Sequence, residues 1–320
     1  MPRMPRLLPH LLPLAVVASL SLMPALQAMP APEPRQVPRT ADLYKRGYTE
    51  ADFPRVQKLA DGVYSYEQVR SAGTEKYATD SLFVETPAGV RVADGQGSVE
   101  ETARMLAEIA KVTPRPVTHL VIGSDHGDHT AGNTAFPPDV KVYATPASKA
   151  ILSGGRAGAT PQEITAVDQQ LTLTLGGTEI QVLFLGRAHT GGDLSVYLPK
   201  EKVLFMSEAY LNRVFPAMRS AYPSEWVATI EKAQAMDVTT YVPGHGFVET
   251  PAILKEELEN ARQALLTVIA EAKRLHSARV PVAEAVTQAR FGDLETWALR
   301  ASQGATAIRR VYLELEGQLK

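Results

Sequence analysis

The chain of 320 residues contains no cysteine. Disulfide bonds, thiolate metal ligands, a cysteine nucleophile and a lipid-modified cysteine are therefore excluded. Neither sign of charge is in excess, because 33 lysines and arginines stand against 35 aspartates and glutamates, a formal net charge of −2. Aromatic residues make up only 7% of the chain, and no basic cluster interleaves with them. Nucleic acid is therefore not an expected partner.

Long apolar runs are also scarce, and the one near the N-terminus is typical of a secretory signal. Arg3 and Arg6 precede an apolar stretch from about Leu11 to Leu26, and Ala28 suits the cleavage point. The stretch is short for a bilayer span and is interrupted by prolines, which disfavours the alternative of a retained anchor. We therefore expect a signal peptide over residues 1–28, no stable membrane insertion after its cleavage, and a periplasmic or secreted protein.

The rest of the chain divides into three parts. Residues 29–54 begin with several prolines and are expected to form a linker and an N-terminal extension. Over residues 55–250, strand and helix patterns recur in two halves, each ending in residues that bind metals. This recurrence predicts an α/β sandwich with two sheets inside and helices outside. Residues 251–320 are almost wholly helical in pattern, and their apolar stripes predict a C-terminal helical extension packed on the sandwich.

The most informative stretch is Ser124-Asp125-His126-Gly127-Asp128-His129, which directly follows the apolar run 120–123. Three potential metal ligands lie there within four residues. His189 and His245 each lie in a glycine-containing turn that also follows an apolar run. Imidazole and carboxylate groups suit zinc, and a catalytic zinc site leaves one position open for water. Four histidines in one shared setting therefore predict a zinc hydrolase rather than isolated structural histidines.

These motifs, in this order, resemble the metallo-β-lactamase superfamily. The resemblance covers about residues 55–250 and rests on three pieces of sequence. They are residues 124–129 against the family's HxHxDH, Arg187-Ala188-His189-Thr190 followed by Gly191-Gly192-Asp193, and Pro243-Gly244-His245-Gly246. The resemblance implies an αββα sandwich that holds its metal at the mouth between the two sheets.

The resemblance also implies two metal sites. In the first, His126 and His189 match the family, but Ser124 replaces the remaining histidine. Glu208 stands where an aspartate that bridges both metals is usual. The second site keeps all of its ligands, which are Asp128, His129 and His245. A serine hydroxyl is a poor ligand compared with imidazole, so the second site is expected to be the stronger.

Ser124 leaves three interpretations open. In the first, the enzyme holds one zinc ion in the second site, and His126 and His189 are free to handle protons or oxyanions. In the second, it holds two zinc ions, and Glu208 reaches across to repair the first site. In the third, the site is degenerate, and the protein binds a metal or ligand without turnover.

The hydrolase that the resemblance implies uses metal-bound hydroxide to attack a carbonyl carbon of a small-molecule substrate. Asp128 would orient the hydroxide and pass a proton to the leaving group, and His126 or His189 would stabilise the oxyanion. A β-lactam, another amide, an ester, a lactone or a thioester fits this chemistry, and sulfate and phosphate esters stay open. A serine hydrolase that uses Ser124 is disfavoured, because no Gly-x-Ser-x-Gly elbow surrounds it.

Further residues are expected around the metal ligands. Side chains that could orient the ligands or contact the substrate are Ser124, Asp125, Thr130, Asn133, Asp193, Tyr210 and Arg213. The last two belong to residues 210–222, a segment rich in aromatics and arginine that could form a substrate wall, with Arg213 or Arg219 meeting a carboxylate. The alternative for this segment is a packed loop with solvated arginines.

Overall fold

The computed structural model describes residues 1–2, 37–154 and 160–319. The expected signal peptide and most of the expected proline-rich linker lie outside these residues. The chain divides into two units, Met1–Val37 and Pro38–Lys320, and the fold is that of the second. Within the described ranges, no helix combines the length and apolar character needed to cross a membrane.

The first sheet has seven strands in the order of the chain. They are β1 (Arg55–Ala60), β2 (Val63–Ala72), β3 (Glu75–Thr86), β4 (Gly89–Ala93), β5 (Val117–Val121), β6 (Lys141–Ala144) and β7 (Ile164–Ala166). Strands β1 to β4 pair antiparallel, and β4 to β7 pair parallel. Parallel neighbours need crossovers, which here contain α1 (Val99–Val112), the short α2 (Gly127–Thr130) with η2 (Asn133–Ala135), and α3 (Pro146–Ser153).

The second sheet has five strands in the order β12-β11-β10-β9-β8. They are β8 (Gln170–Leu175), β9 (Thr178–Leu183), β10 (Ser195–Leu198), β11 (Val203–Phe205) and β12 (Thr240–Val242). The pairs are antiparallel except β11 with β12. The crossover between these two parallel strands contains η3 (Ser207–Ala209) and α4 (Pro223–Gln234). Each half of the sandwich therefore has parallel strands whose C-terminal ends can carry functional loops.

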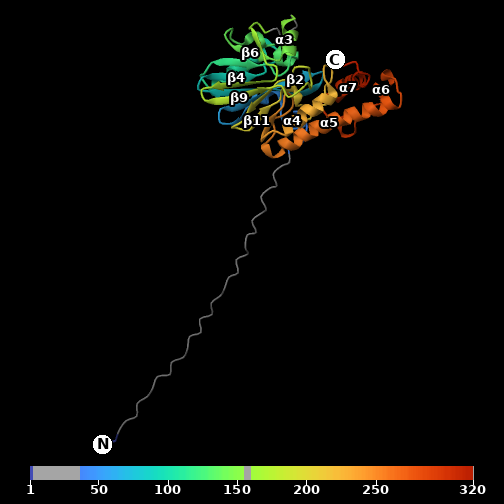
Figure 1. Cartoon of the computed structure of the whole chain (residues 1–320). Coiled ribbons are helices and arrows are strands. Elements are labelled where there is room, and N and C mark those ends of the chain that lie inside the picture. The colour runs from blue at the N-terminus through green and yellow to red at the C-terminus, as the bar shows by residue number, and fades with distance from the viewer. Residues whose placement is uncertain (3–36, 155–159, 320) are drawn as a thin grey trace. The chain divides into compact units, whose positions relative to one another are not determined.

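Apolar residues from both sheets form the central layer of the molecule, as Val121 and Phe205 illustrate. The outer face of the first sheet is covered by α1, whose Met105 and Ile109 are buried against it. Helix α1 starts at Val99 because the Ser98 side chain accepts a hydrogen bond from the Glu101 backbone. With helices also over the second sheet, the predicted αββα sandwich is confirmed (Figure 1).

The chain after residue 250 forms α5 (Pro251–Ser277), α6 (Val282–Gln288), η4 (Gly292–Thr296) and α7 (Arg300–Leu315). Leu265 of α5 and Ile308 of α7 belong to the same buried cluster as Trp226 of α4 and Tyr241 of β12. Figure 1 shows these orange and red helices beside α4. The C-terminal helices and the second sheet therefore share one hydrophobic core.

The later part of the expected N-terminal extension also packs on the sandwich. Leu43 and Phe53 form a small buried cluster with Phe247, and Tyr48 stacks on the Phe247 ring. The short helix η1 (Glu50–Asp52) lies within this segment. Because Phe247 follows His245 by two residues, the extension helps to fix the turn that carries this histidine.

His119 lies in β5 and is a buried histidine outside the metal-type motifs. Its ring stacks on Tyr143 with the ring centroids 6.0 Å apart. Burial, together with the charges of Arg91 and Lys141, lowers the pKa of His119 from 6.5 to about 4. The folded protein therefore keeps His119 neutral at a pH where the unfolded chain takes up a proton.

We expect His119→Gln to flatten the acid side of the stability profile. The contribution of a neutral His119 is present above pH 6.5 and is lost as the pH falls toward about 4. Urea unfolding at a series of pH values should show the free energy of unfolding of the wild type falling more steeply over this interval than that of the variant. Parallel profiles for the two proteins would contradict the assignment.

Candidate metal centre

The six predicted metal ligands converge at one edge of the sandwich. The loop after β5 and helix α2 carry His126, Asp128 and His129, the segment before β10 carries His189, η3 carries Glu208, and the turn after β12 carries His245. Their donor atoms form two groups, and within each group the atoms lie within 4.8 Å of one another. The groups are Asp128, His129, Glu208 and His245, and His126, His189 and Glu208. Glu208 thus belongs to both.

The Glu208 carboxylate lies between the two groups. Its Oε2 atom is 2.9 Å from Nδ1 of His126 and 2.9 Å from Nδ1 of His189. Its Oε1 atom is 3.2 Å from Nε2 of His245. The buried Ser124 hydroxyl donates a hydrogen bond of 2.5 Å to Oε2. Ser124 is therefore next to the first group, and it acts on that group through Glu208.

The donor atoms fit a divalent metal ion such as zinc. Nε2 of His129 and Nε2 of His245 face each other at 3.4 Å, and Oδ2 of Asp128 is 3.2 Å from Nε2 of His245. Nδ1 of His189 is buried and forms no hydrogen bond within the described ranges, although it points to Glu208. Buried ring nitrogens normally find a partner, and imidazoles that converge on carboxylates are the usual donor set of zinc.

The charges of the site depend on one another. Burial by itself would raise the pKa of Glu208, but His189 and His126 hold it well below its ordinary value. Burial would likewise lower the pKa of His126, but the Glu208 charge raises it to about 9. A cation that binds here has to displace protons from the imidazoles. Metal affinity should therefore weaken as the pH falls.

Asp94 orients His129 of the second group, although it belongs to none of the sequence motifs. Oδ2 of Asp94 is 3.1 Å from Nδ1 of His129 and accepts a hydrogen bond of 2.5 Å from the Ser207 hydroxyl. Oδ1 accepts a hydrogen bond of 2.6 Å from the Gly123 backbone. A carboxylate of this kind orients a metal-binding imidazole. The sequence feature that could have indicated Asp94 is its position directly after the strand pattern at 90–93.

The other histidines are oriented by groups that their own motifs do not contain. Nδ1 of His245 lies 3.1 Å from the carbonyl oxygen of Ala78, and Nε2 of His126 lies 3.3 Å from the Ser220 hydroxyl. The His189 ring packs on Trp226 with the centroids 5.3 Å apart. These contacts leave Nδ1 of His126 and Nε2 of His245 directed at Glu208.

Two glycines of the ligand-bearing turns give the Glu208 segment its space. A Cβ atom on Gly123 would lie 2.6 Å from Cβ of Ser207, and one on Gly244 would lie 2.7 Å from the backbone nitrogen of Glu208. Neither separation is sterically allowed. Only glycine at these positions permits the turns after β5 and β12 to approach η3 closely enough for the donors to meet.

Among the predicted surrounding residues, Asp125, Thr130 and Asp193 lie beside the centre. Asp193 accepts hydrogen bonds from the backbone and the hydroxyl of Thr190, both 2.7 Å long, and burial raises the pKa of Asp193 to about 6. It thereby fixes the turn that carries His189. Asp125 accepts a hydrogen bond of 2.9 Å from Ser148 and lines a cavity described below. The Thr130 hydroxyl donates to the carbonyl oxygen of His126.

The structure corrects three other expected positions. Asn133 donates to the Thr160 hydroxyl, and among the described residues it forms no hydrogen bond with a metal-type side chain. Tyr210 is wholly buried in the core of the second sheet. Arg213 forms a two-pronged ion pair with the buried Glu257 of α5. None of these three side chains lines either of the cavities at the metal centre.

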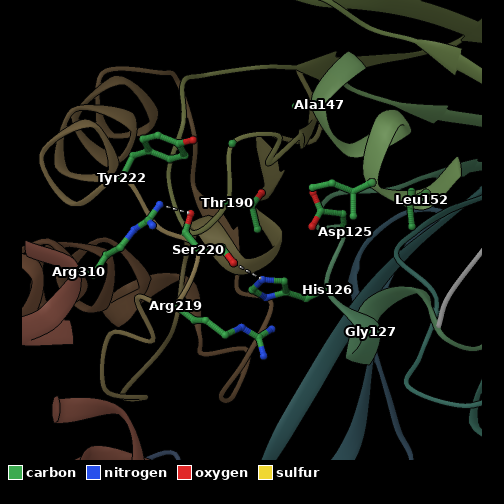
Figure 2. A pocket seen from close by; sticks show the side chains of 12 residues that line it. Asp125, His126, Gly127, Ala147, Leu152, Thr190, Arg219, Ser220, Tyr222 and Arg310 are labelled. Atoms are coloured by element: carbon green, nitrogen blue, oxygen red, sulfur yellow. Dashed lines mark hydrogen bonds between the residues drawn. The ribbon is translucent and has the colours of Figure 1, made fainter. Parts of the chain in front are cut away.

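Two cavities meet at the donor groups. The smaller, of about 290 Å³, is lined by Asp128, Glu208 and three of the histidines, and by Gln303 and Thr306 of α7. The larger, of about 680 Å³, is lined by residues 125–127, by α3 and by residues 219–222, among others (Figure 2). His126 and Arg219 line both cavities. The two cavities therefore adjoin each other at these two side chains.

The comparisons with known proteins agree with this geometry. The sequence model of the metallo-β-lactamase superfamily matches residues 77–245, and the chain belongs to this family. It is 25% identical over 197 residues to a metallo-β-lactamase type 2 of Elizabethkingia meningoseptica, covering 60% of this chain and 78% of the relative. It is 24% identical over 203 residues to the 2,4-dinitroanisole O-demethylase subunit alpha of Nocardioides sp. (strain JS1661), covering 62% of this chain and 57% of that relative.

Solved structures show the same fold. A metallo-β-lactamase from Pontibacter korlensis superposes with a TM-score of 0.59 at 23% identity, over 65% of this chain and 98% of the other. A metallo-β-lactamase from Hirschia baltica superposes with a TM-score of 0.57 at 18% identity, over 66% of this chain and 97% of the other. Family, fold and donor groups together define a metal-dependent hydrolase of the metallo-β-lactamase superfamily.

We expect zinc binding to tolerate Ser124→His and Glu208→Asp only when the two substitutions are made together. An imidazole in Ser124→His would enter space that the Glu208 carboxylate occupies, because the two side chains are 2.5 Å apart. Glu208→Asp alone would withdraw the carboxylate from His126 and His189. Each single variant should bind less zinc than the wild type, and the double variant, which restores the family's usual residues, should recover. We expect a coupling of about 1–3 kcal/mol in unfolding free energy.

The wild type, the two single variants and the double variant form a double-mutant cycle. It is measured by elemental analysis of zinc per chain and by urea unfolding. Ser124→Ala is the matched control, since it removes the hydrogen bond to Glu208 without adding bulk. Additive losses in the double variant would show that the two residues do not compensate each other.

Proposed function

We propose that this protein hydrolyses a carbonyl compound at a metal centre whose two donor groups, each of which includes Glu208, would hold zinc. The observation that supports this most is the position of the Glu208 carboxylate, within 3.2 Å of ring nitrogens from both donor groups. Of the three interpretations of Ser124, this geometry favours the one in which Glu208 repairs the first site. The second group has four donors against three, so it remains the stronger site.

Zinc held by these residues would act as a Lewis acid and lower the pKa of a water molecule to about 7. Asp128 is the most exposed of the donors, with 28% of its side chain exposed against 11% for His126 and 4% for Glu208. It can therefore orient the attacking water and pass a proton to the leaving group. The backbone of Asp128 is held by Arg70, which donates to its carbonyl oxygen.

The shape of the smaller cavity supports an acyl substrate of modest size. Leu211, Val214 and Ala217 add apolar side chains to the lining that contains the donor groups. Esters, thioesters, lactones and amides, including β-lactams, suit a cleft with one polar and one apolar side. β-Lactams are included among these candidates because a relative of the same family is named a metallo-β-lactamase.

We expect Asp128→Ala to lower the hydrolytic rate by about 10²–10⁴, the usual contribution of a positioned proton-transfer group. The measurement is turnover of lactam, lactone, ester and thioester substrates by zinc-loaded protein, before and after treatment with a chelator. Asp139→Asn is the matched control, because Asp139 is exposed and lines neither cavity. Activity that survives complete metal removal, or full activity and zinc content in Asp128→Ala, would refute the proposal.

We also propose that the protein is exported, with a periplasmic or secreted mature form. Arg3, Arg6 and the apolar stretch that follows them support this proposal. Mass spectrometry of the protein recovered from the periplasmic fraction of a bacterial host should detect a chain that begins at Met29. Recovery of the intact chain from the cytoplasm alone would contradict export.

A further inference from the structure

The segment 220–222 is held by the C-terminal helix α7. The Arg310 guanidinium of α7 donates hydrogen bonds to the carbonyl oxygens of Ala221, at 2.5 Å, and Ser220, at 3.1 Å. The same guanidinium lies over the Tyr222 ring, 5.5 Å from its centroid. It forms no ion pair with a carboxylate in the part of the chain that the structure describes. The hydrogen bonds of the Arg310 side chain among these residues are therefore all made with this segment.

This segment is connected to both histidines of the first donor group. The Ser220 hydroxyl lies 3.3 Å from Nε2 of His126, and Figure 2 shows this contact together with the one from α7. The Tyr222 backbone donates a hydrogen bond of 2.9 Å to the carbonyl oxygen of Ala188, which directly precedes His189. A change in how α7 holds the segment can therefore reach both imidazoles of that group.

The histidines of the second donor group have other supports. Nδ1 of His129 lies 3.1 Å from the Asp94 carboxylate, and Nδ1 of His245 lies 3.1 Å from the carbonyl oxygen of Ala78. Within the described ranges, residues 220–222 form no hydrogen bond with either of these two histidines. A disturbance of the segment should therefore affect the first group and leave the second in place.

The contact with Ser220 bears on which nitrogen of His126 is free to bind a metal. A neutral imidazole has one ring nitrogen that carries hydrogen and one that offers a lone pair. Nδ1 of His126 is 2.9 Å from Oε2 of Glu208 and belongs to the donor atoms of the first group. When Nε2 carries the hydrogen and donates it to the Ser220 hydroxyl, Nδ1 keeps its lone pair for a metal. The position of Ser220 therefore favours the tautomer that can act as a ligand.

We propose that Arg310 is a positioning residue for the first donor group. It holds the segment 220–222 so that the Ser220 hydroxyl keeps Nδ1 of His126 available to a metal. The inference rests on the proposed function, in which both donor groups hold zinc. The zinc affinity of the first group then depends on a helix that lies after the matched residues 77–245. Groups that orient a metal ligand typically change metal affinity by about 10–100-fold.

The test is a zinc titration of the metal-free protein in competition with a chromophoric chelator, which measures the affinity of each binding step. We expect Arg310→Gln, which removes the guanidinium, to lower the affinity of the weaker step by about tenfold and to leave the stronger step unchanged. Ser220→Ala removes the hydroxyl but keeps the carbonyl oxygen that Arg310 binds, and it should weaken the same step. Arg310→Lys should recover part of the affinity, because an ammonium group can still donate to a carbonyl oxygen.

Arg309→Gln is the matched control, because Arg309 is the exposed neighbour of Arg310 on α7 and lines neither cavity. Both zinc affinities of this variant should equal those of the wild type. A general loss of structure in Arg310→Gln would lower both affinities alike, and that result, or two unchanged affinities, would overturn the inference. If Arg310→Gln does not fold, the smaller selective loss expected in Arg310→Lys becomes the deciding measurement.

A second measurement separates this inference from the proposed function. A wild type that binds a single zinc ion would refute the assignment of zinc to both donor groups. The ¹⁵N chemical shifts of the His126 ring in the one-zinc protein then decide the inference by themselves. Shifts that differ from the wild type in Arg310→Gln but not in Arg309→Gln would support the positioning role, and identical shifts in all three proteins would overturn it.

Discussion

The buried carboxylate of Glu208 is the constraint on which the rest of the site depends. Removing a charge from water costs on the order of several kcal/mol, and the cost is offset only by partners with good geometry. Here the partners are His126, His189 and His245 together with the Ser124 hydroxyl. Loss of any of these groups leaves the carboxylate less compensated. The groups of the site therefore depend on one another, and Ser124 helps to stabilise the charge of Glu208.

The sandwich brings these groups together because a hydrogen bond connects its two sheets at the edge where the metal ligands lie. Asp94 follows β4 in the first sheet, and Ser207 follows β11 in the second, and their side chains are hydrogen-bonded to each other. The same Asp94 carboxylate orients His129. Gly123 and Gly244 then allow the ligand-bearing turns to approach Ser207 and Glu208. The separation of the sheets and the separation of the metal ligands are thus set by the same contacts.

Much of this could be predicted from the sequence, for a physical reason. A metal centre needs several donors, and each donor follows an apolar strand pattern at the C-terminal end of a strand, so the motifs identify both the fold and the ligands. Asp94 was predictable in principle, because it follows the strand at 90–93 in the same way. The Ser220 contact to His126 was not, because it depends on how a loop folds back across the cavity.

The two arginines of the loop after Glu208 show where sequence reasoning ends. Arg213 and Arg219 were equivalent candidates for a substrate contact. Glu257, 44 residues beyond Arg213, decides between them, because it pairs with Arg213 and leaves Arg219 free among the described residues. Which of the two arginines is paired depends on tertiary packing, and the local sequence around them does not indicate it.

The C-terminal helix α7 contacts both the wall of the larger cavity and the segment beside the metal centre. Arg310 lines the larger cavity and also donates hydrogen bonds to the carbonyl oxygens of Ser220 and Ala221. Ser220 in turn contacts His126, whose other ring nitrogen faces Glu208. A movement of α7 would therefore shift the wall of the cavity and one of the donors together. In this chain, a helix that lies after the matched residues 77–245 is therefore connected through Ser220 to a donor that lies within them.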